Sequence, residues 1–456
     1  MSIEGKKKIF LEQKKIINNC FEYLDDIKKY GIKINLSPFC FFTTWTKSFG
    51  YFKIQQFNKQ YINFDFFIFF FKNILSVLKN GNFELICNKK IFENKSYRSI
   101  ILSYCDKLSF NNKNIFFDKY FGISSNETDQ CIFILISLDN FIPNEIHKNI
   151  LIIKRKISLL NILFFVYFFF LVLFKNKFNL KKFFHYFNYE HFFITKINII
   201  FEKIFSKIEF KNFLINYEGI NFQNFSLEKV KKMNGNIQTI GYLHCAPWPL
   251  QTDLICKTRY LDKLFVSSFD QKDVLNKYFK WPEKKIFTIP SLRFNKSSNT
   301  EFSNYIFLPY YILNKKKYLE HFQDLLVFLA NGKLGRLNTR IHPLNKNSKQ
   351  HKIFAQELKI ILKKYQHKID NRVKNVSIFI GSATGVCCQA LEENNIIYHI
   401  PGDHTLDVFS PYIWKSIDVL SISSGIFKYS IKKKNKIFYV NSEKKKFIKY
   451  INPHLK

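Results

Sequence analysis

Short apolar runs alternate with amphipathic, lysine-rich stretches along most of the chain. The apolar runs predict buried strands, and the segments of helical period between them predict helices. The predicted strands are 100–103, 131–137, 150–153, 213–216, 238–243, 264–267, 286–289, 305–310, 338–341, 376–380 and 396–400. The predicted helices are 226–233, 270–278, 318–330, 352–365 and 385–393. Uniformly apolar strands that alternate with helices are typical of parallel sheets with helices on their faces.

The length of 456 residues is enough for two or three domains at roughly 100–200 residues each. The polar stretch 295–303 is the best candidate for a linker. We therefore expect an α/β fold of two tandem, Rossmann-like, doubly wound domains. The N-terminal domain covers 1–300, and the C-terminal domain covers 301–456 with a C-terminal tail.

One uncharged apolar stretch, 157–174, interrupts this pattern between two basic clusters. As a helix its 18 residues reach about 27 Å, a little less than the ~30 Å hydrocarbon core of a bilayer. A single span would place the residues before and after it on opposite sides of a membrane, although both are needed for one fold. We expect a helix or hairpin in the plane of a membrane, or an apolar core helix.

The composition favours anionic partners and a reducing compartment. The formal net charge is +36, with the lysines spread along the whole chain and no nucleic-acid-binding module around them. A membrane surface or a phosphorylated substrate fits this charge better than a nucleic acid. The nine cysteines are odd in number and lack CxxC spacing, and no secretory signal begins the chain. We expect a cytoplasmic protein, peripheral on the inner face of the cytoplasmic membrane.

In the C-terminal half, two candidate phosphate-binding groups follow predicted strands, where ligands of open parallel sheets gather. Gly381, Ser382 and Thr384 belong to a small turn that opens a helix, and free N–H groups with hydroxyls can hold a phosphate there. His342 and Pro343 end the strand before it along the chain. The simpler interpretations are a helix N-cap and a polar loop histidine.

In the N-terminal half, Glu218 and His244 follow two neighbouring predicted strands. A carboxylate and an imidazole at adjacent strand ends are suited to act as a general base and its orienting partner. Arg293 follows the last strand before the linker and is expected to face the C-terminal domain. Surface ion pairing is the ordinary role of such residues.

Several motifs are absent from the sequence. It contains no Asp-x-Asp, no GxGxxG and no GxxxxGK[ST]. A dinucleotide dehydrogenase and a P-loop kinase are thereby disfavoured, and no metal or other cofactor is expected.

The short motifs resemble those of a known enzyme class. The His342-Pro343 dipeptide, the Ser382 to Thr384 turn and the following Gln389 resemble the C-terminal half of GT-B glycosyltransferases that build bacterial capsule, lipopolysaccharide O-antigen and sialylated glycans. Many GT-B enzymes carry a glutamate where Gln389 stands. The N-terminal pattern from Glu218 to His244 is similar to that of surface-carbohydrate biosynthesis proteins.

This resemblance implies a metal-independent transferase that moves a sugar from a nucleotide-activated donor to a glycan or lipid-linked acceptor. A CMP-sugar is favoured as donor, with UDP- and GDP-sugars as alternatives. By the resemblance, His342 contacts the donor phosphate or nucleotide, Ser382 and Thr384 contact the phosphate, and Glu218 is the base. Arg293 is expected to help stabilise the leaving phosphate, and Gln389 stands at the position that binds the ribose hydroxyls. The competing hypotheses are a GT-B-like epimerase, a polyol-phosphate transferase and a non-catalytic membrane scaffold with a degenerate GT-B fold.

Overall fold

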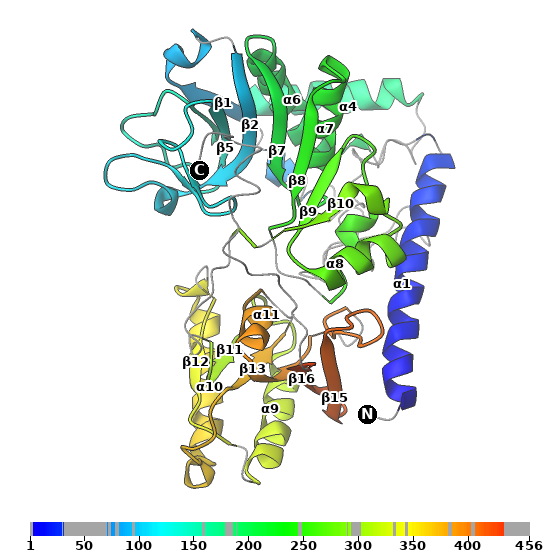
Figure 1. The fold of residues 1–456 in the computed structure, drawn as a ribbon, viewed down its shortest axis with the longest axis vertical. Coiled ribbons are helices and arrows are strands. Elements are labelled where there is room, and N and C mark those ends of the chain that lie inside the picture. Colours follow the sequence, from blue (N-terminus) through cyan, green and yellow to red (C-terminus); the bar gives the residue numbers. More distant parts are fainter. Residues whose placement is uncertain are drawn as a thin grey trace.

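The computed structural model describes residues 3–29, 31, 71, 74–77, 82–93, 96–156, 160–177, 186–187, 189–244, 249–289, 291–292, 302–331, 334–342, 345–381, 385–402 and 406–432 (Figure 1). Of the predicted site residues, Arg293, Pro343, Ser382 and Thr384 lie outside these ranges, as does most of the predicted linker.

The described strands form one sheet of eight strands, one of six and a two-stranded ribbon. The larger sheet has the order β1-β6-β5-β2-β7-β8-β9-β10, and the smaller has the order β12-β11-β13-β14-β16-β15. The larger sheet consists of β1 (Asn82–Cys87), β2 (Ser96–Cys105), β5 (Cys131–Ser137), β6 (Ile150–Lys156), β7 (Glu209–Asn216), β8 (Gln238–Tyr242), β9 (Lys263–Val266) and β10 (Ile286–Thr288). The smaller consists of β11 (Tyr305–Phe307), β12 (Asn338–Arg340), β13 (Val376–Ile380), β14 (Ile396–Ile400), β15 (Ile417–Ser423) and β16 (Ile426–Ile431). The ribbon pairs β3 (Phe117–Asp118) with β4 (Ile123–Ser124).

The larger sheet is parallel except at β1 and is covered differently on its two faces. Alternate residues of β2 enter different cores, as the two-residue period of a strand requires. Ile100 packs in the core that contains α6 (Tyr189–Phe205) and α7 (Asn221–Met233), whereas Ile101 packs against Phe116 and Phe121 of the chain after β2. Helices therefore cover one face, and the segment that carries the β3–β4 ribbon covers the other.

The smaller sheet has helices on both faces. Ile378 of β13 lies in a core with α9 (Lys315–Leu329) and α10 (Lys349–Lys363), and its neighbour Phe379 lies with α11 (Gly385–Glu392). The caps of α9 and α10 follow from sequence: Asn314 and Ser348 accept from the N–H groups of Lys317 and His351. Strands β11 to β14 run parallel, and β16 and β15 add an antiparallel edge.

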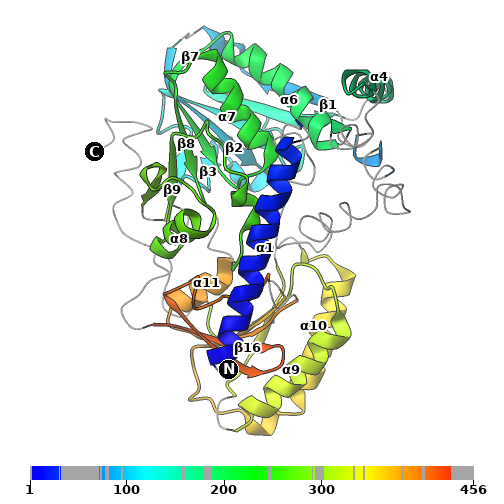
Figure 2. The same ribbon diagram turned by 90° about the vertical axis from the view of Figure 1, so that its right-hand side faces the viewer.

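The first helix, α1 (Ile3–Lys29), runs alongside both halves of the molecule (Figure 2). Its buried positions recur every three or four residues, which makes one apolar stripe. The stripe shares a core with α6 and with the segment 406–414 that follows β14, and the buried Gln13 Nε2 donates to Val408 O at 2.8 Å. This stripe consists of Ile9, Ile16, Ile17, Cys20, Tyr23, Leu24 and Ile27. One continuous core thus connects the two sheets through α1 and the 406–414 segment.

The expected α/β class with two tandem Rossmann-like sheets is confirmed by this topology. The apolar stretch 157–174 forms one helix over its described part, α4 (Leu160–Lys175), which lies at the outside of the larger sheet's helical face (Figure 2). Among the helices that the structure describes, none has the length and apolar character needed to span a bilayer.

Candidate functional site

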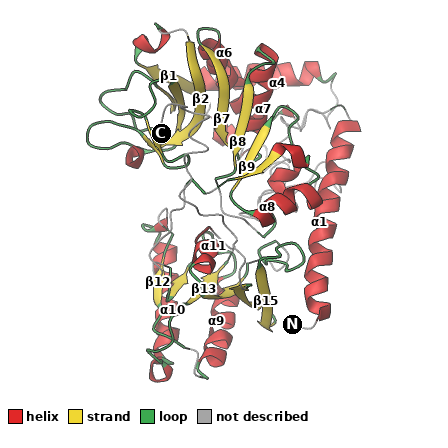
Figure 3. Ribbon diagram, viewed as in Figure 1, coloured by secondary structure: helices red, strands yellow, loops and turns green. Residues whose placement is uncertain are grey.

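Both sheets contain a point at which the order of the strands reverses, and ligands of open α/β sheets bind beside such points. In the larger sheet the chain proceeds from β2 outward through β5 to β6 and then returns to the other side of β2 at β7. In the smaller sheet β12 flanks β11 on one side and β13 flanks it on the other (Figure 1; strands are yellow in Figure 3). The reversal points are therefore β2/β7 and β11/β13.

Glu218 and His244 come together at the carboxyl edge of the larger sheet. Because β7 and β8 pair in parallel with Asn216 opposite Tyr242, the residues two positions further along each chain are also opposite. Glu218 Oε1 lies 3.2 Å from His244 Nε2. The His244 side chain is 4% exposed and that of Glu218 is 32% exposed, so the imidazole supports a carboxylate that reaches solvent.

The loop that carries Glu218 is held by the first turn of α7. The Glu218 N–H donates to Gln223 Oε1 at 2.8 Å, and Gln223 Nε2 donates to Asn216 O at 2.8 Å. Asn224 binds the loop as well: it accepts from the Tyr217 hydroxyl and donates to Gly219 O. Both amides are fully buried, so a buried polar network fixes the backbone of the loop that carries Glu218.

Two further residues near this pair come from the ribbon that follows β2. The Tyr120 ring meets the His244 imidazole edge to face at 4.5 Å between centroids. Asp118 Oδ1 accepts from the N–H groups of Tyr120 and Phe121, and burial raises the pKa of its carboxyl while the nearby His244 opposes this rise. The sequence gives no signal for either residue, since they lie on short irregular chain with no periodic pattern.

Gly381 lies at the reversal point of the smaller sheet, directly after β13. Its φ of +88° belongs to the left-handed region, and a Cβ at this position would lie 2.5 Å from the Cβ of Pro309. Gly381 therefore lets the chain after β13 approach the chain after β11 closely. The Gly381 carbonyl oxygen lies 2.6 Å from Nε2 of His399 on the neighbouring strand β14, and this contact holds the carbonyl in place.

His342 follows β12 and contacts the same region through Tyr310. The two rings meet edge to face at 5.0 Å. Burial lowers the pKa of His342, and the nearby His351 lowers it further. The strands before His342 and Gly381 are consecutive along the chain, but in the sheet β11 lies between them. Tyr310, three residues after β11, contacts His342, and the preceding Pro309 lies against Gly381. The chain that follows β11 therefore connects the two, and the sequence did not single out either residue.

Gln389 is the remaining predicted site residue that the structure describes. It lies half-buried on α11, one turn beyond the first residue of this helix. Cys387 and Cys388 are fully buried on the same helix, and burial raises the pKa of both thiols. Within the described ranges, no three His, Cys, Asp or Glu side chains gather as metal ligands do.

The carboxyl edges of the two sheets face one another across the molecule (Figure 1). The chain that leaves β8 and the chain that leaves β14 meet where Trp414 Nε1 donates to Pro249 O at 2.9 Å. A second contact joins the Ser416 N–H to Asp270 Oδ2 at 2.8 Å. The residues after β7 and β8 thus lie on the side of the larger sheet that is directed toward the residues after β11 and β13.

No protein-family model matches the sequence, and no curated protein matches it. Among solved structures, the chain is similar to an α,α-trehalose-phosphate synthase (UDP-forming) from Burkholderia vietnamiensis, with 8% identity over 68% of this chain and 89% of that chain and a TM-score of 0.34. It is also similar to an α,α-trehalose 6-phosphate synthase from Burkholderia multivorans, with 10% identity over 64% of this chain and 78% of that chain and a TM-score of 0.35. Similarities of this size assign no activity to the chain.

Proposed function

We propose that the protein is a glycosyltransferase that moves a sugar from a nucleotide-activated donor to an acceptor hydroxyl. The observation that supports this most directly is the Glu218–His244 pair at the reversal point of one sheet, directed toward the reversal point of a second sheet that carries Gly381 and His342. Such a site has a base on one side and groups suited to a phosphate on the other.

In the proposed reaction Glu218 accepts the proton of the acceptor hydroxyl as its oxygen attacks the anomeric carbon. The bond between that carbon and the donor phosphate breaks, and the phosphate oxygen keeps the electron pair. His244 and the buried amides of α7 keep the Glu218 carboxylate in position. His342 stabilises the charge that develops on the leaving phosphate, and the hydroxyls of Ser382 and Thr384 are the further groups that the sequence predicts for this role.

The finer parts of the proposal rest on the sequence. The absence of an Asp-x-Asp motif favours transfer without a metal ion, and the His342-Pro343 dipeptide favours a CMP-sugar over a UDP- or GDP-sugar. The net charge of +36 and the apolar α4 favour a glycan or lipid-linked acceptor at a membrane surface, with the protein attached peripherally.

Replacement of the base tests the mechanism. We expect Glu218→Gln to lower the turnover of sugar transfer by roughly 10²–10⁴ while donor binding stays nearly unchanged, because the amide cannot accept the acceptor proton. Glu228→Gln is a matched control, since Glu228 lies on α7 in an ion pair with Lys232. A Glu218→Gln enzyme within a few-fold of the parent at saturating donor would remove this residue from the mechanism.

The donor class is tested by thermal shift with CMP, UDP, GDP and their sugar conjugates. A ligand at a hundred times its dissociation constant stabilises the folded state by about 2.7 kcal/mol, which a melting curve resolves. We expect one nucleotide class to raise the melting temperature. Radiolabelled donor then distinguishes transfer from epimerisation. If no nucleotide raises the melting temperature, the scaffold hypothesis is favoured instead.

A further inference from the structure

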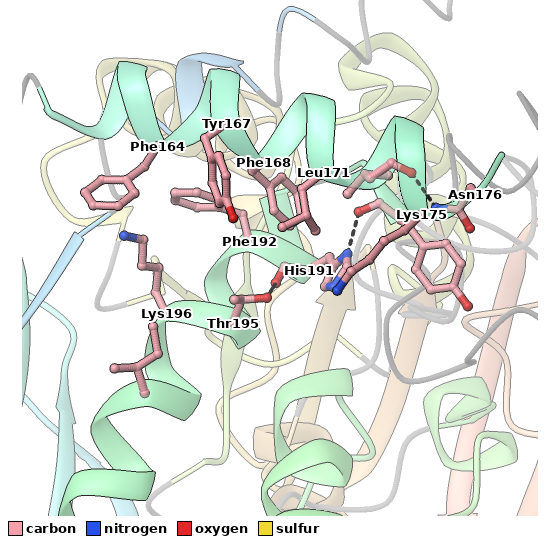
Figure 4. Close-up of a pocket in the computed structure, with 13 residues that line it drawn as sticks. Phe164, Tyr167, Phe168, Leu171, Lys175, Asn176, His191, Phe192, Thr195 and Lys196 are labelled. Atoms are coloured by element: carbon pink, nitrogen blue, oxygen red, sulfur yellow. Dashed lines mark hydrogen bonds between the residues drawn. The ribbon is translucent and has the colours of Figure 1, made fainter. Parts of the chain in front are cut away.

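A groove of about 550 Å³ runs between α4 and α6 (Figure 4). Its walls are one stripe of each helix: Phe164, Phe168 and Leu171 come from α4, and Phe192 and Ile199 come from α6. From Phe164 to Lys175, α4 rises about 16 Å, roughly half of the ~30 Å hydrocarbon core of a bilayer. That is the depth that one acyl chain fills.

The few polar groups of the groove already bond to the backbone. The Thr195 hydroxyl donates to His191 O at 2.8 Å, and Asn176 Nδ2 donates to Val172 O at 2.7 Å. His191 Nδ1 lies 2.6 Å from Tyr186 O. The interior therefore suits an apolar chain better than a polar molecule.

Each end of the groove carries a lysine. Lys196 Nζ lies 3.6 Å from the centroid of the Phe164 ring at one end, and Lys175 lies at the other (Figure 4). Burial lowers the pKa of Lys196, which shows that its ammonium is partly removed from water. A negatively charged group at this end would compensate the lost hydration.

The rest of α4 presents large apolar side chains to the outside. Leu160, Leu163 and Phe174 are each at least 60% exposed, an unusual amount for one helix of a water-exposed surface. Lys154, Arg155 and Lys156 precede this helix in the sequence, and Lys175 and Lys177 end it. Apolar side chains between basic clusters are the pattern of helices that lie in the interface of anionic membranes.

We propose that the α4–α6 groove holds one acyl chain of an anionic phospholipid, whose phosphate contacts Lys196, while the outer side of α4 rests in the membrane interface. The inference deepens the membrane attachment in the proposed function and adds a specific lipid site to it. The apolar length of the groove matches one acyl chain, and the lysines at its ends favour a negatively charged headgroup.

Vesicle flotation of the full chain tests whether the charge of Lys196 contributes to binding of an anionic lipid. With phosphatidylglycerol and phosphatidylcholine vesicles, we expect Lys196→Glu to weaken binding by about thirty-fold. The change removes one positive charge and adds one negative charge, and each charge near an anionic surface is worth ≈ 1 kcal/mol, which is about five-fold. Lys203→Glu is the matched control, because Lys203 is exposed on the same helix outside the groove. We expect it to weaken binding by less than about three-fold. An equal loss in both variants would mean general charge attraction and would overturn the lipid site.

A photoreactive phosphatidylglycerol tests the groove itself. A diazirine near the end of its acyl chain is expected to label peptides from α4 and α6. Thr195→Trp fills the groove from an exposed position and should abolish this label, while Ser206→Trp, exposed just after α6, should leave it intact. Unchanged melting temperatures show that both variants are folded. Label that survives in Thr195→Trp, or that appears elsewhere, contradicts the proposal.

Two further outcomes would also overturn it. Self-association without lipid that Thr195→Trp abolishes would mean that a second copy fills the groove, and labelling by a photoreactive fatty acid alone would mean a free amphiphile. None of these readouts uses sugar transfer. Failure of the transferase assays with intact lipid labelling would therefore reject the proposed activity and leave the lipid site.

Discussion

The His342 imidazole lies in surroundings that favour its neutral form, because burial and the nearby His351 lower its pKa. A phosphate bound beside it reverses this preference and raises the pKa, so binding takes up a proton. The affinity for a nucleotide is therefore expected to increase several-fold as the pH falls from about 8 to 6.

Titration calorimetry on the parent and on His342→Gln checks this expectation. The ligand's own phosphate titrates equally with both proteins, so only the difference between them reports on His342. We expect the parent to gain more affinity at low pH than the variant. Parallel pH curves would place the phosphate away from this residue.

At the residue scale, the sequence was sufficient to predict site residues that come shortly after the end of a strand. Glu218 and His244 were predicted because both residues come shortly after apolar runs that are true strands, and parallel register brings them to 3.2 Å. Asp118 and Tyr120 were not predicted, because their approach to His244 depends on the path of an irregular segment. Their proximity is a tertiary property that no local pattern encodes.

At the scale of elements, the connection between β7 and α7 depends on Gly219. Its φ is +82°, and a Cβ would lie 2.8 Å from the carbonyl oxygen of Asp253. We expect Gly219→Ala to lower the free energy of unfolding by at least about 1–2 kcal/mol and to lower turnover as well, since the change displaces Glu218.

Chemical denaturation measures the loss in the free energy of unfolding of Gly219→Ala. Gly235→Ala is the control. No heavy atom of another segment lies within 4 Å of a Cβ at Gly235, and this residue also flanks α7. Its replacement is expected to change stability by less than about 1 kcal/mol. Equal effects of the two substitutions would show that the turn after β7 tolerates a side chain.

The apolar core strands were the elements that the sequence predicted best. The predicted bounds of β5, β13 and β14 agree with the structure, because these strands are buried on both faces and read as continuous apolar runs. The antiparallel strands β1, β15 and β16 were missed, since polar residues interrupt them. The position of β11 between β12 and β13 was also missed, because strand order is decided by helix packing rather than by local sequence.

At the scale of the whole molecule, α1 connects the two sheets. Gln13 is fully buried, and its amide donates to a carbonyl of the segment after β14. Gln13→Ala removes this donor and leaves Val408 O buried without it, which is expected to cost about 1–3 kcal/mol. Because one core contains α1 and residues of both sheets, we expect both halves to lose stability together.

Hydrogen exchange measures this coupling through the amides of β8 and β14. In Gln13→Ala, protection should fall by a similar factor in both strands. Lys14→Ala, at an exposed position of the same helix, should leave both unchanged. A loss confined to β14 would show that the two sheets unfold independently.

The contact between Gln13 and Val408 also has a consequence for synthesis in the cell. The two residues are 395 positions apart, so at about 5–20 residues per second the ribosome needs roughly 20–80 s to produce the second after the first. During this interval the part of the α1 apolar stripe that packs on the segment after β14 has no access to that segment. We expect the nascent chain to expose these side chains, as chaperone substrates do, until the 406–414 segment has been synthesised.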